Sequence, residues 1–116
     1  GVETVDIWSY KGQYPIAKIE GLTYRDVESV LGESTISALL AKQEPSQEDF
    51  ASIRNAINDI GGLITTYTYK PLVGIKSQTS PNGMTIHYEY DGFGRLVRAL
   101  DQNGSVISIN SYHYKK

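Results

Sequence analysis

The sequence predicts an α+β fold with a short N-terminal β segment, two or three amphipathic helices and an antiparallel β-meander of hairpin repeats. Apolar residues recur at helical spacing within residues 23–61. Aromatic residues alternate within residues 62–116, and this segment matches itself after a shift of 21 residues. The segments 1–22, 23–61 and 62–116 are expected to form one compact unit, because 116 residues suit a single domain. Since the chain begins at Gly1 without a signal segment, we expect a fragment of a longer protein.

The N-terminal β segment is expected to contain two short strands, residues 7–10 and 14–19, around a turn at 11–13. Trp8 and Tyr10 occupy alternate positions and are expected to share a face that covers the helices. Pro15 has no backbone N–H, which places it on an edge strand or among the first residues of its strand.

The helical segment contains two capping boxes, Thr23 with Asp26 and Ser46 with Asp49. Gly32, Pro45 and the pair Gly61-Gly62 are the expected helix ends. Each helix carries one apolar stripe, which predicts packing on a sheet or on a missing neighbour rather than a cofactor or membrane role. The stripe residues are Val27, Val30, Leu31, Ile36, Leu39, Leu40, Phe50, Ile53, Ile57 and Ile60.

The repeating segment is built from Tyr-x-Tyr pairs followed by turns. Tyr67-Thr68-Tyr69 aligns with Tyr88-Glu89-Tyr90, Ile75 with Leu96, and Asn82-Gly83 with Asn103-Gly104. A third pair, Tyr112-His113-Tyr114, follows after a three-residue insertion. Alternation places both rings of a pair on one face of a strand, and Asn-Gly is a strong hairpin signal. The pattern therefore predicts an antiparallel meander in which each hairpin adds to the last.

Residues 82–96, with the sequence NGMTIHYEYDGFGRL, resemble the YD repeat of the RHS family. The repeat-defining positions are Gly83, Asp91, Gly94, Arg95, Leu96 and Gly104, together with Tyr88 and Tyr90. The preceding copy departs from the pattern, with Lys70 in place of the Asp and Gly74-Ile75 in place of Arg-Leu. The final copy keeps only Tyr112 and Tyr114. The whole chain is similar to the C-terminal end of large RHS/YD-repeat proteins of the Bacteroides group.

This resemblance implies a cell-surface or secreted protein whose YD hairpins form extended arrays. Such proteins are implicated in toxin delivery, intercellular interaction and carbohydrate binding. Because the sequence lacks the RHS-associated core signature and a toxin domain, a toxin activity is not expected of this piece. We therefore expect a non-enzymatic structural and interaction module at the end of a repeat array. The alternative is a carbohydrate-binding module that uses exposed Tyr rows.

The expected partners are upstream repeats of the same polypeptide and cell-surface glycans or proteins. A net charge of −2 argues against nucleic acid, and no apolar run is long enough for membrane insertion. The charge is uneven, with ten acids and five bases in residues 1–61 and three acids and six bases after them. If the first strand is an unpaired sheet edge, we also expect copies to associate through it.

The candidate ligand residues are the aromatic row Tyr67, Tyr69, Tyr88, Tyr90, Tyr112 and Tyr114. Exposed, these rings would stack on sugar faces; covered, they would form the core of the repeat. Asp91 and Arg95 are expected to form a pair that fixes their turn. Glu89 and Asp91 superficially resemble a glycosidase pair, but alternate carboxylates are common on polar strands. We expect no catalytic residue, cofactor or metal, because there is no Cys and the two His lack a carboxylate cluster.

Overall fold

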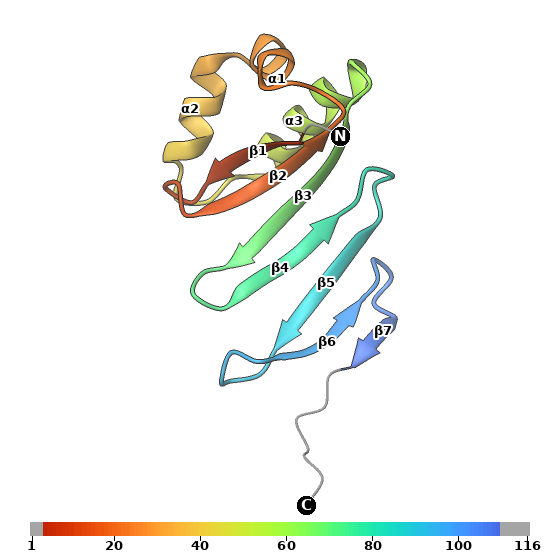
Figure 1. Ribbon diagram of the computed structural model, residues 1–116. Helices are drawn as coiled ribbons and strands as arrows, with labels where there is room; N and C mark the ends of the chain where they lie inside the picture. Colours follow the sequence, from red (N-terminus) through yellow and green to blue (C-terminus); the bar gives the residue numbers. More distant parts are fainter. Residues whose placement is uncertain (1–3, 110–116) are drawn as a thin grey trace, which may run out of the picture. The chain divides into compact units, whose positions relative to one another are not determined.

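The computed structural model describes residues 4–109, which contain three helices and a meander of seven strands (Figure 1). The strands are β1 (Thr4–Ser9), β2 (Tyr14–Glu20), β3 (Leu63–Lys70), β4 (Gly74–Thr79), β5 (Thr85–Tyr90), β6 (Leu96–Leu100) and β7 (Val106–Ile109). The helices α1 (Tyr24–Leu31), α2 (Glu33–Ala41) and α3 (Gln47–Asp59) lie between β2 and β3 in the chain. This order confirms the predicted α+β class.

The chain divides into two compact units, residues 1–66 and 67–116, with the boundary inside β3. β3 contributes to both units because its two halves have different partners. Leu63–Thr66 pairs with β2, whereas the Thr68 hydroxyl bonds that of Ser77 on β4. The boundaries expected after residues 22 and 61 coincide with changes of secondary structure. That they also separate domains stays a prediction.

The first unit begins with the antiparallel hairpin β1–β2, and β2 continues to β3, so β2 is a central strand. Pro15 is the second residue of β2, which agrees with the expectation that it lies on an edge strand or among the first residues of its strand. The expectation that Trp8 and Tyr10 share a face is wrong. Trp8 is exposed in β1, whereas Tyr10 is buried and has a φ of 55°. Strand alternation ends at Ser9 because the backbone turns there.

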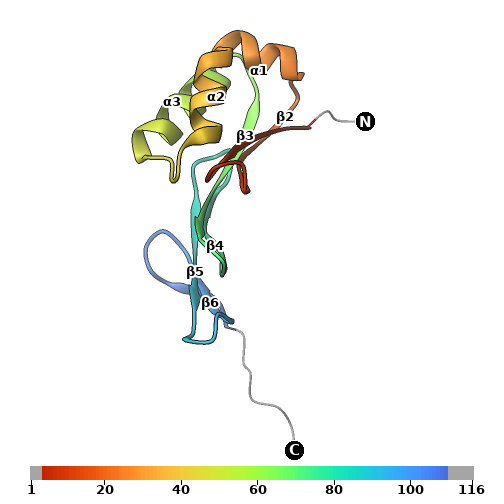
Figure 2. The same cartoon turned by 90° about the vertical axis from the view of Figure 1, so that its left-hand side faces the viewer.

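The helices gather on one side of the strands of the first unit (Figure 2). The core between them consists of fully buried aliphatic side chains from both layers: Ile7, Ile16, Ile19, Val27, Ile53, Ile57 and Ile64. On β1 the buried positions alternate, as expected for a strand with one covered face. Ile60 was expected in this stripe but is exposed, because α3 ends at Asp59 and Ile60 is its C-cap.

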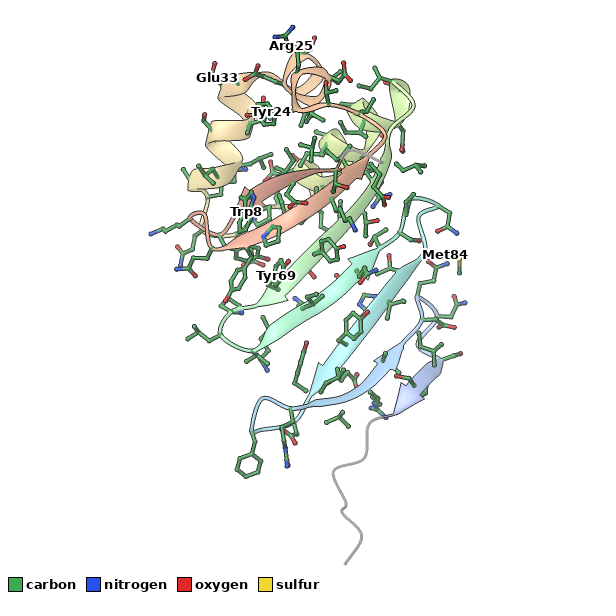
Figure 3. All side chains as sticks on the ribbon, in the orientation of Figure 1. Trp8, Tyr24, Arg25, Glu33, Tyr69 and Met84 are labelled. Carbon is green, nitrogen blue, oxygen red and sulfur yellow. The ribbon has the colours of Figure 1, made fainter. Side chains whose placement is uncertain are left out.

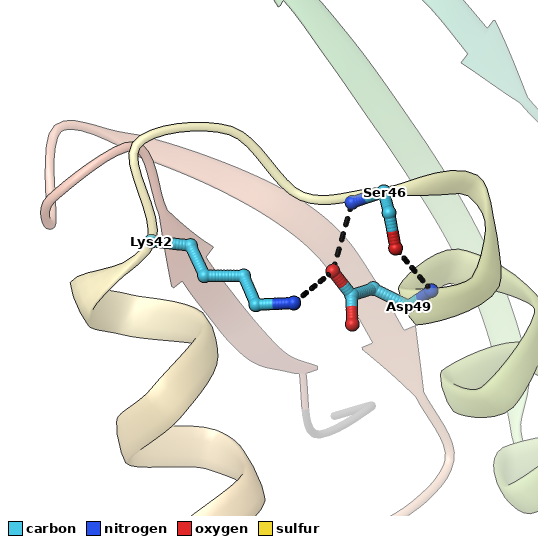
Figure 4. A network of polar contacts seen from close by, with 3 residues as sticks. All are labelled: Lys42, Ser46 and Asp49. Carbon is cyan, nitrogen blue, oxygen red and sulfur yellow. Dashed lines mark hydrogen bonds and ion pairs between the residues drawn. The ribbon is translucent and has the colours of Figure 1, made fainter.

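Both predicted capping boxes are present. In α3, the Asp49 N–H donates to Ser46 Oγ at 3.1 Å and the Ser46 N–H donates to Asp49 Oδ2 at 2.8 Å (Figure 4). Lys42 Nζ lies 2.6 Å from the same carboxylate oxygen, so Asp49 also ties the end of α2 to the start of α3. The Lys42 ammonium and the Ser46 N–H hold the pKa of Asp49 below its usual value. In α1, Thr23 and Asp26 make the same reciprocal pair.

The second unit is a single antiparallel layer in the order β3-β4-β5-β6-β7. It contains no helix within residues 67–109, and Ala99 is the only buried apolar side chain there for which burial is described. Most other strand positions are half-buried. This unit is therefore stabilised by pairs between neighbouring strands more than by a closed core.

Candidate functional site

Three turns of the second unit, residues 80–84, 91–95 and 101–105, have one and the same backbone geometry. The first residue donates its N–H to the carbonyl of the fifth at 2.8–2.9 Å. Its own carbonyl accepts from the N–H of the fourth residue at 2.9–3.1 Å. The fourth residue is Gly in each turn, with φ between 77° and 89°. Only glycine adopts this left-handed conformation at little cost, which explains why Gly83, Gly94 and Gly104 recur.

Asp91 organises the middle turn through three hydrogen bonds. Its Oδ1 accepts from the N–H groups of Phe93 at 2.8 Å and Arg95 at 3.0 Å, and its Oδ2 lies 2.9 Å from Arg95 Nε. The Asp91–Arg95 pair expected from the sequence is therefore present. The backbone N–H of Arg95, followed by that of Phe93, lowers the pKa of Asp91. Asp91 is thus held ionised as a turn anchor.

Asp101 plays the same part in the last turn, although the sequence analysis did not single it out. Its Oδ1 accepts from the N–H groups of Asn103 and Ser105, both at 2.9 Å. The available signal was the shared spacing Asp-x-x-Gly, which occurs at Asp91 and again ten residues later. In the first of the three turns Asn82 substitutes for the anchor, because its Oδ1 accepts from the N–H of Met84 at 3.1 Å.

The turn between β3 and β4 departs from this geometry, as its sequence does. Lys70 stands where the Asp would be, and its carbonyl accepts from the N–H of Val73 at 3.0 Å. Leu72 adopts a φ of 67° and its side chain is 95% exposed. A non-glycine residue at positive φ is strained, so the degenerate copy keeps the hairpin with a less favourable turn.

The described tyrosines of the row, Tyr67 and Tyr69 on β3 and Tyr88 and Tyr90 on β5, lie on the same face of the second unit. Thr68 bonds Ser77, and Ser77 lies opposite His87, so these three side chains share one face. Because side chains alternate along a strand, the four rings occupy the other face. All four are half-buried; Tyr69 is labelled in Figure 3. Tyr112 and Tyr114 lie outside the described residues.

Tyr90 is the most constrained of these rings. Its hydroxyl donates to the carbonyl of Ile75 at 2.6 Å, across the β4–β5 pair. A Cβ built on Gly74 would lie 2.7 Å from the same hydroxyl oxygen, so only glycine leaves room for the ring in this position. Partial burial, followed by the nearby Tyr88, raises the pKa of Tyr90. Tyr90 therefore joins one repeat to the hairpin before it.

The opposite face of the second unit is polar and its groups are paired across strands. The Thr68 and Ser77 hydroxyls lie 2.5 Å apart, those of Thr79 and Thr85 lie 2.9 Å apart, and Arg98 Nε lies 2.5 Å from Glu89 Oε1. Glu89 therefore interacts with Arg98, and Asp91 with its own turn. General acid catalysis requires a carboxyl with a raised pKa, whereas that of Asp91 is lowered.

Within residues 4–109, no group of three or more His, Asp or Glu side chains is arranged to hold a metal ion. None of the helices in this part of the chain is both long and apolar enough to cross a membrane.

Comparison with known proteins identifies part of the meander. Residues 74–106 match the family described as RHS Repeat. This segment contains β4, β5, β6 and all three turns of common geometry. No curated protein and no solved structure matches the chain. This part of the chain is therefore similar to an RHS repeat.

Proposed function

We propose that this chain is a non-enzymatic structural and interaction module at the C-terminal end of a cell-surface or secreted RHS/YD-repeat protein of the Bacteroides type. The observation that carries the proposal is the five-residue turn that recurs at 80–84, 91–95 and 101–105 within the RHS match. Each such turn closes a hairpin that pairs with the next, so the unit can extend indefinitely by addition of further copies. Upstream repeats of the same polypeptide are its first expected partner.

The polar chemistry of the meander supports a structural rather than catalytic role. Both described carboxylates of the YD unit have local partners. Glu89 pairs with Arg98, and Asp91 interacts with its own turn and with Arg95. An enzyme based on Glu89 and Asp91 would instead lose turnover of glycoside substrates in Glu89→Gln and Asp91→Asn variants. Detection of such turnover in the unmodified protein would contradict the proposal.

The test of location uses the native full-length protein with an epitope inserted in the exposed turn at 102–104. An antibody added to intact cells, or to the culture medium after secretion, is expected to detect the epitope without permeabilisation. A matched insertion at the turn 81–83 controls for local accessibility. Detection only after the cells are opened would overturn the surface assignment.

Carbohydrate binding is the second candidate, and the arrangement of the tyrosines favours it. Tyr67, Tyr69, Tyr88 and Tyr90 lie on one face, partly exposed, and no helix of their own unit covers them within residues 67–109. Rows of aromatic rings offer flat apolar surfaces on which sugar rings stack.

A glycan array with the unmodified chain and the Tyr88→Ala variant tests this candidate. Tyr88 is preferred to Tyr90 because the Tyr90 hydroxyl bonds the Ile75 carbonyl, so its loss also changes stability. Binding that is lost in Tyr88→Ala at unchanged melting temperature supports the candidate. His87→Ala, on the opposite face, is the matched control and is expected to bind normally. Absence of binding to every glycan, or equal loss in both variants, would contradict it.

A further inference from the structure

The first unit contains a groove of about 260 Å³ between β1 and the helices α1 and α2. Its β1 wall is formed by Asp6, Ile7 and Trp8, and its helical wall includes Tyr24 and Glu33, labelled with Trp8 in Figure 3. The apolar part of the lining is unusually accessible. Trp8 is 40%, Tyr24 50% and Leu40 46% exposed. Large side chains that are exposed together around a depression mark interaction sites.

The strand that forms one wall is also an open sheet edge. β1 is the first strand of its sheet and pairs with β2 on one side, and within residues 4–109 no strand pairs with its other side. The register shifts between Ile7 and Trp8 because β2 has an additional residue, Ile16, while β1 continues without insertion. β1 carries no Lys or Pro, the residues that commonly protect such an edge from pairing. It is therefore suited to addition of an extended chain.

The charged residues that line the groove indicate which side chains a bound polypeptide segment would have. Asp6, Glu28 and Glu33 line the groove, and no Lys, Arg or His does. Among the described residues these three carboxylates form no ion pair with a basic side chain. The aliphatic stem of a Lys or Arg would cover Leu40 while its cation approaches a carboxylate.

We propose that the groove binds an extended polypeptide segment with alternating basic and apolar residues, which adds as a strand to the free side of β1. The segment pairs with the backbone of β1 and directs Lys or Arg side chains toward Glu28 and Glu33 on the helical wall, while its apolar side chains lie on the other face, beside Trp8. A second copy of this chain is a less suitable occupant. Its own edge strand β1 carries Asp6 and no cation, so pairing of two β1 strands would bring like charges together. An upstream repeat of the same polypeptide, which the proposed function expects as a partner, would compete with this segment for the free side of β1.

The test uses the full chain and a blocked peptide of alternating Lys and Val, with Trp8 as the probe. Trp8 is the only tryptophan of the chain and lies in the groove, so its fluorescence reports binding there directly. We expect a saturable change in Trp8 emission that weakens as salt is added, because exposed charges are screened. A peptide of alternating Glu and Val is expected to give no change. Absence of a change with the basic peptide would overturn the proposal.

Two charge reversals separate a specific groove from general attraction to an acidic protein. Glu33 lies in the first turn of α2 and in the groove, whereas Glu48 lies in the first turn of α3 and outside it. Glu33→Lys is expected to weaken peptide binding about tenfold, and Glu48→Lys less than about twofold. Equal weakening by both variants would show that binding is nonspecific.

The pairing with β1 has its own control. The same basic peptide with alternate backbone amides methylated keeps its charge but cannot form the ladder, and we expect it to bind about tenfold more weakly. Hydrogen exchange at the β1 amides should slow only with the unmethylated peptide. Sedimentation across a range of protein concentrations identifies the competing occupant. Association of the chain with itself that Glu33→Lys abolishes would assign the groove to a second copy and overturn the proposal.

Discussion

The contact between Gly74 and Tyr90 gives a quantitative test of how one repeat joins the next. An alanine Cβ at position 74 would lie 2.7 Å from Tyr90 Oη, whereas ordinary contact begins near 3.4 Å. The ring must therefore move by about 0.7 Å, which strains or breaks the 2.6 Å hydrogen bond to the Ile75 carbonyl. Loss of that bond costs about 1 kcal/mol, and residual crowding adds about 1 kcal/mol. The φ of 158° at Gly74, which residues with a Cβ rarely adopt, adds about 1 kcal/mol. Gly74→Ala should thus lower the free energy of unfolding by about 3 kcal/mol.

The same substitution should cost about half as much when the Tyr90 hydroxyl is absent. Tyr90→Phe alone should cost about 1 kcal/mol, because the Ile75 carbonyl loses its donor. In that background the Cβ meets only ring carbons, the nearest at 3.3 Å, so Gly74→Ala should cost about 1.5 kcal/mol, mostly from the φ of 158°. The double-mutant cycle should therefore show a coupling of about 1.5 kcal/mol.

Urea denaturation of the four proteins, followed by far-ultraviolet circular dichroism, measures these free energies. Trp8 fluorescence follows the first unit separately, since this is the single tryptophan and both substitutions lie in the second unit. If the costs of the two single substitutions sum to the cost of the double substitution within about 0.5 kcal/mol, the two sites are independent and the predicted coupling is refuted. Such a result would mean that the Tyr90 hydroxyl does not determine the need for glycine at position 74.

Three further predictions concern single groups. The Ser9 hydroxyl is fully buried and has no hydrogen-bond partner in the described structure, so Ser9→Ala should raise the free energy of unfolding by about 1 kcal/mol in a denaturation followed by Trp8 fluorescence. Leu72 has a φ of 67°, and Leu72→Gly should stabilise the second unit by about 0.5 kcal/mol by circular dichroism; a loss of stability would contradict the strain argument. The turn lowers the pKa of Asp91 in the folded state, so ionised Asp91 stabilises the folded state. This contribution is fully present above the unfolded-state pKa and is lost as the pH falls through the lower folded-state pKa. Unfolding measured from pH 6 downward should accordingly show a loss of stability in acid that is smaller in Asp91→Asn.

Local signals in the sequence were sufficient for the starts of α1 and α3 and for the hairpins. Thr23 and Ser46 each stand three residues before an Asp, and both form the predicted capping boxes. The Asn-Gly pairs at Gly83 and Gly104 form the predicted turns, with left-handed glycines. These features depend on hydrogen bonds between residues within four positions of one another, so a short stretch of sequence contains all the interacting groups.

Two glycines show which features a short stretch of sequence does not predict. Gly62 keeps the spacing of Gly83 and Gly104, yet its φ is not positive. A Cβ there would lie 2.6 Å from Leu22 and 2.7 Å from Ile57, so packing rather than a turn requires glycine. Gly74 is likewise required by a ring sixteen residues away in the chain. In both cases the neighbours come from distant positions, and a repeat in the sequence does not contain that information.

The sequence by itself determined the succession of elements, the helix caps, the phase of the hairpins and the resemblance that the match at 74–106 supports. Only the tertiary structure decided which side chains meet across strands. It placed the tyrosines on one face and left a groove of apolar and acidic residues beside the free edge of β1. The physical reason is range: caps and turns are closed by near neighbours, whereas faces, grooves and close approaches arise from strand register and helix packing between segments far apart in the chain.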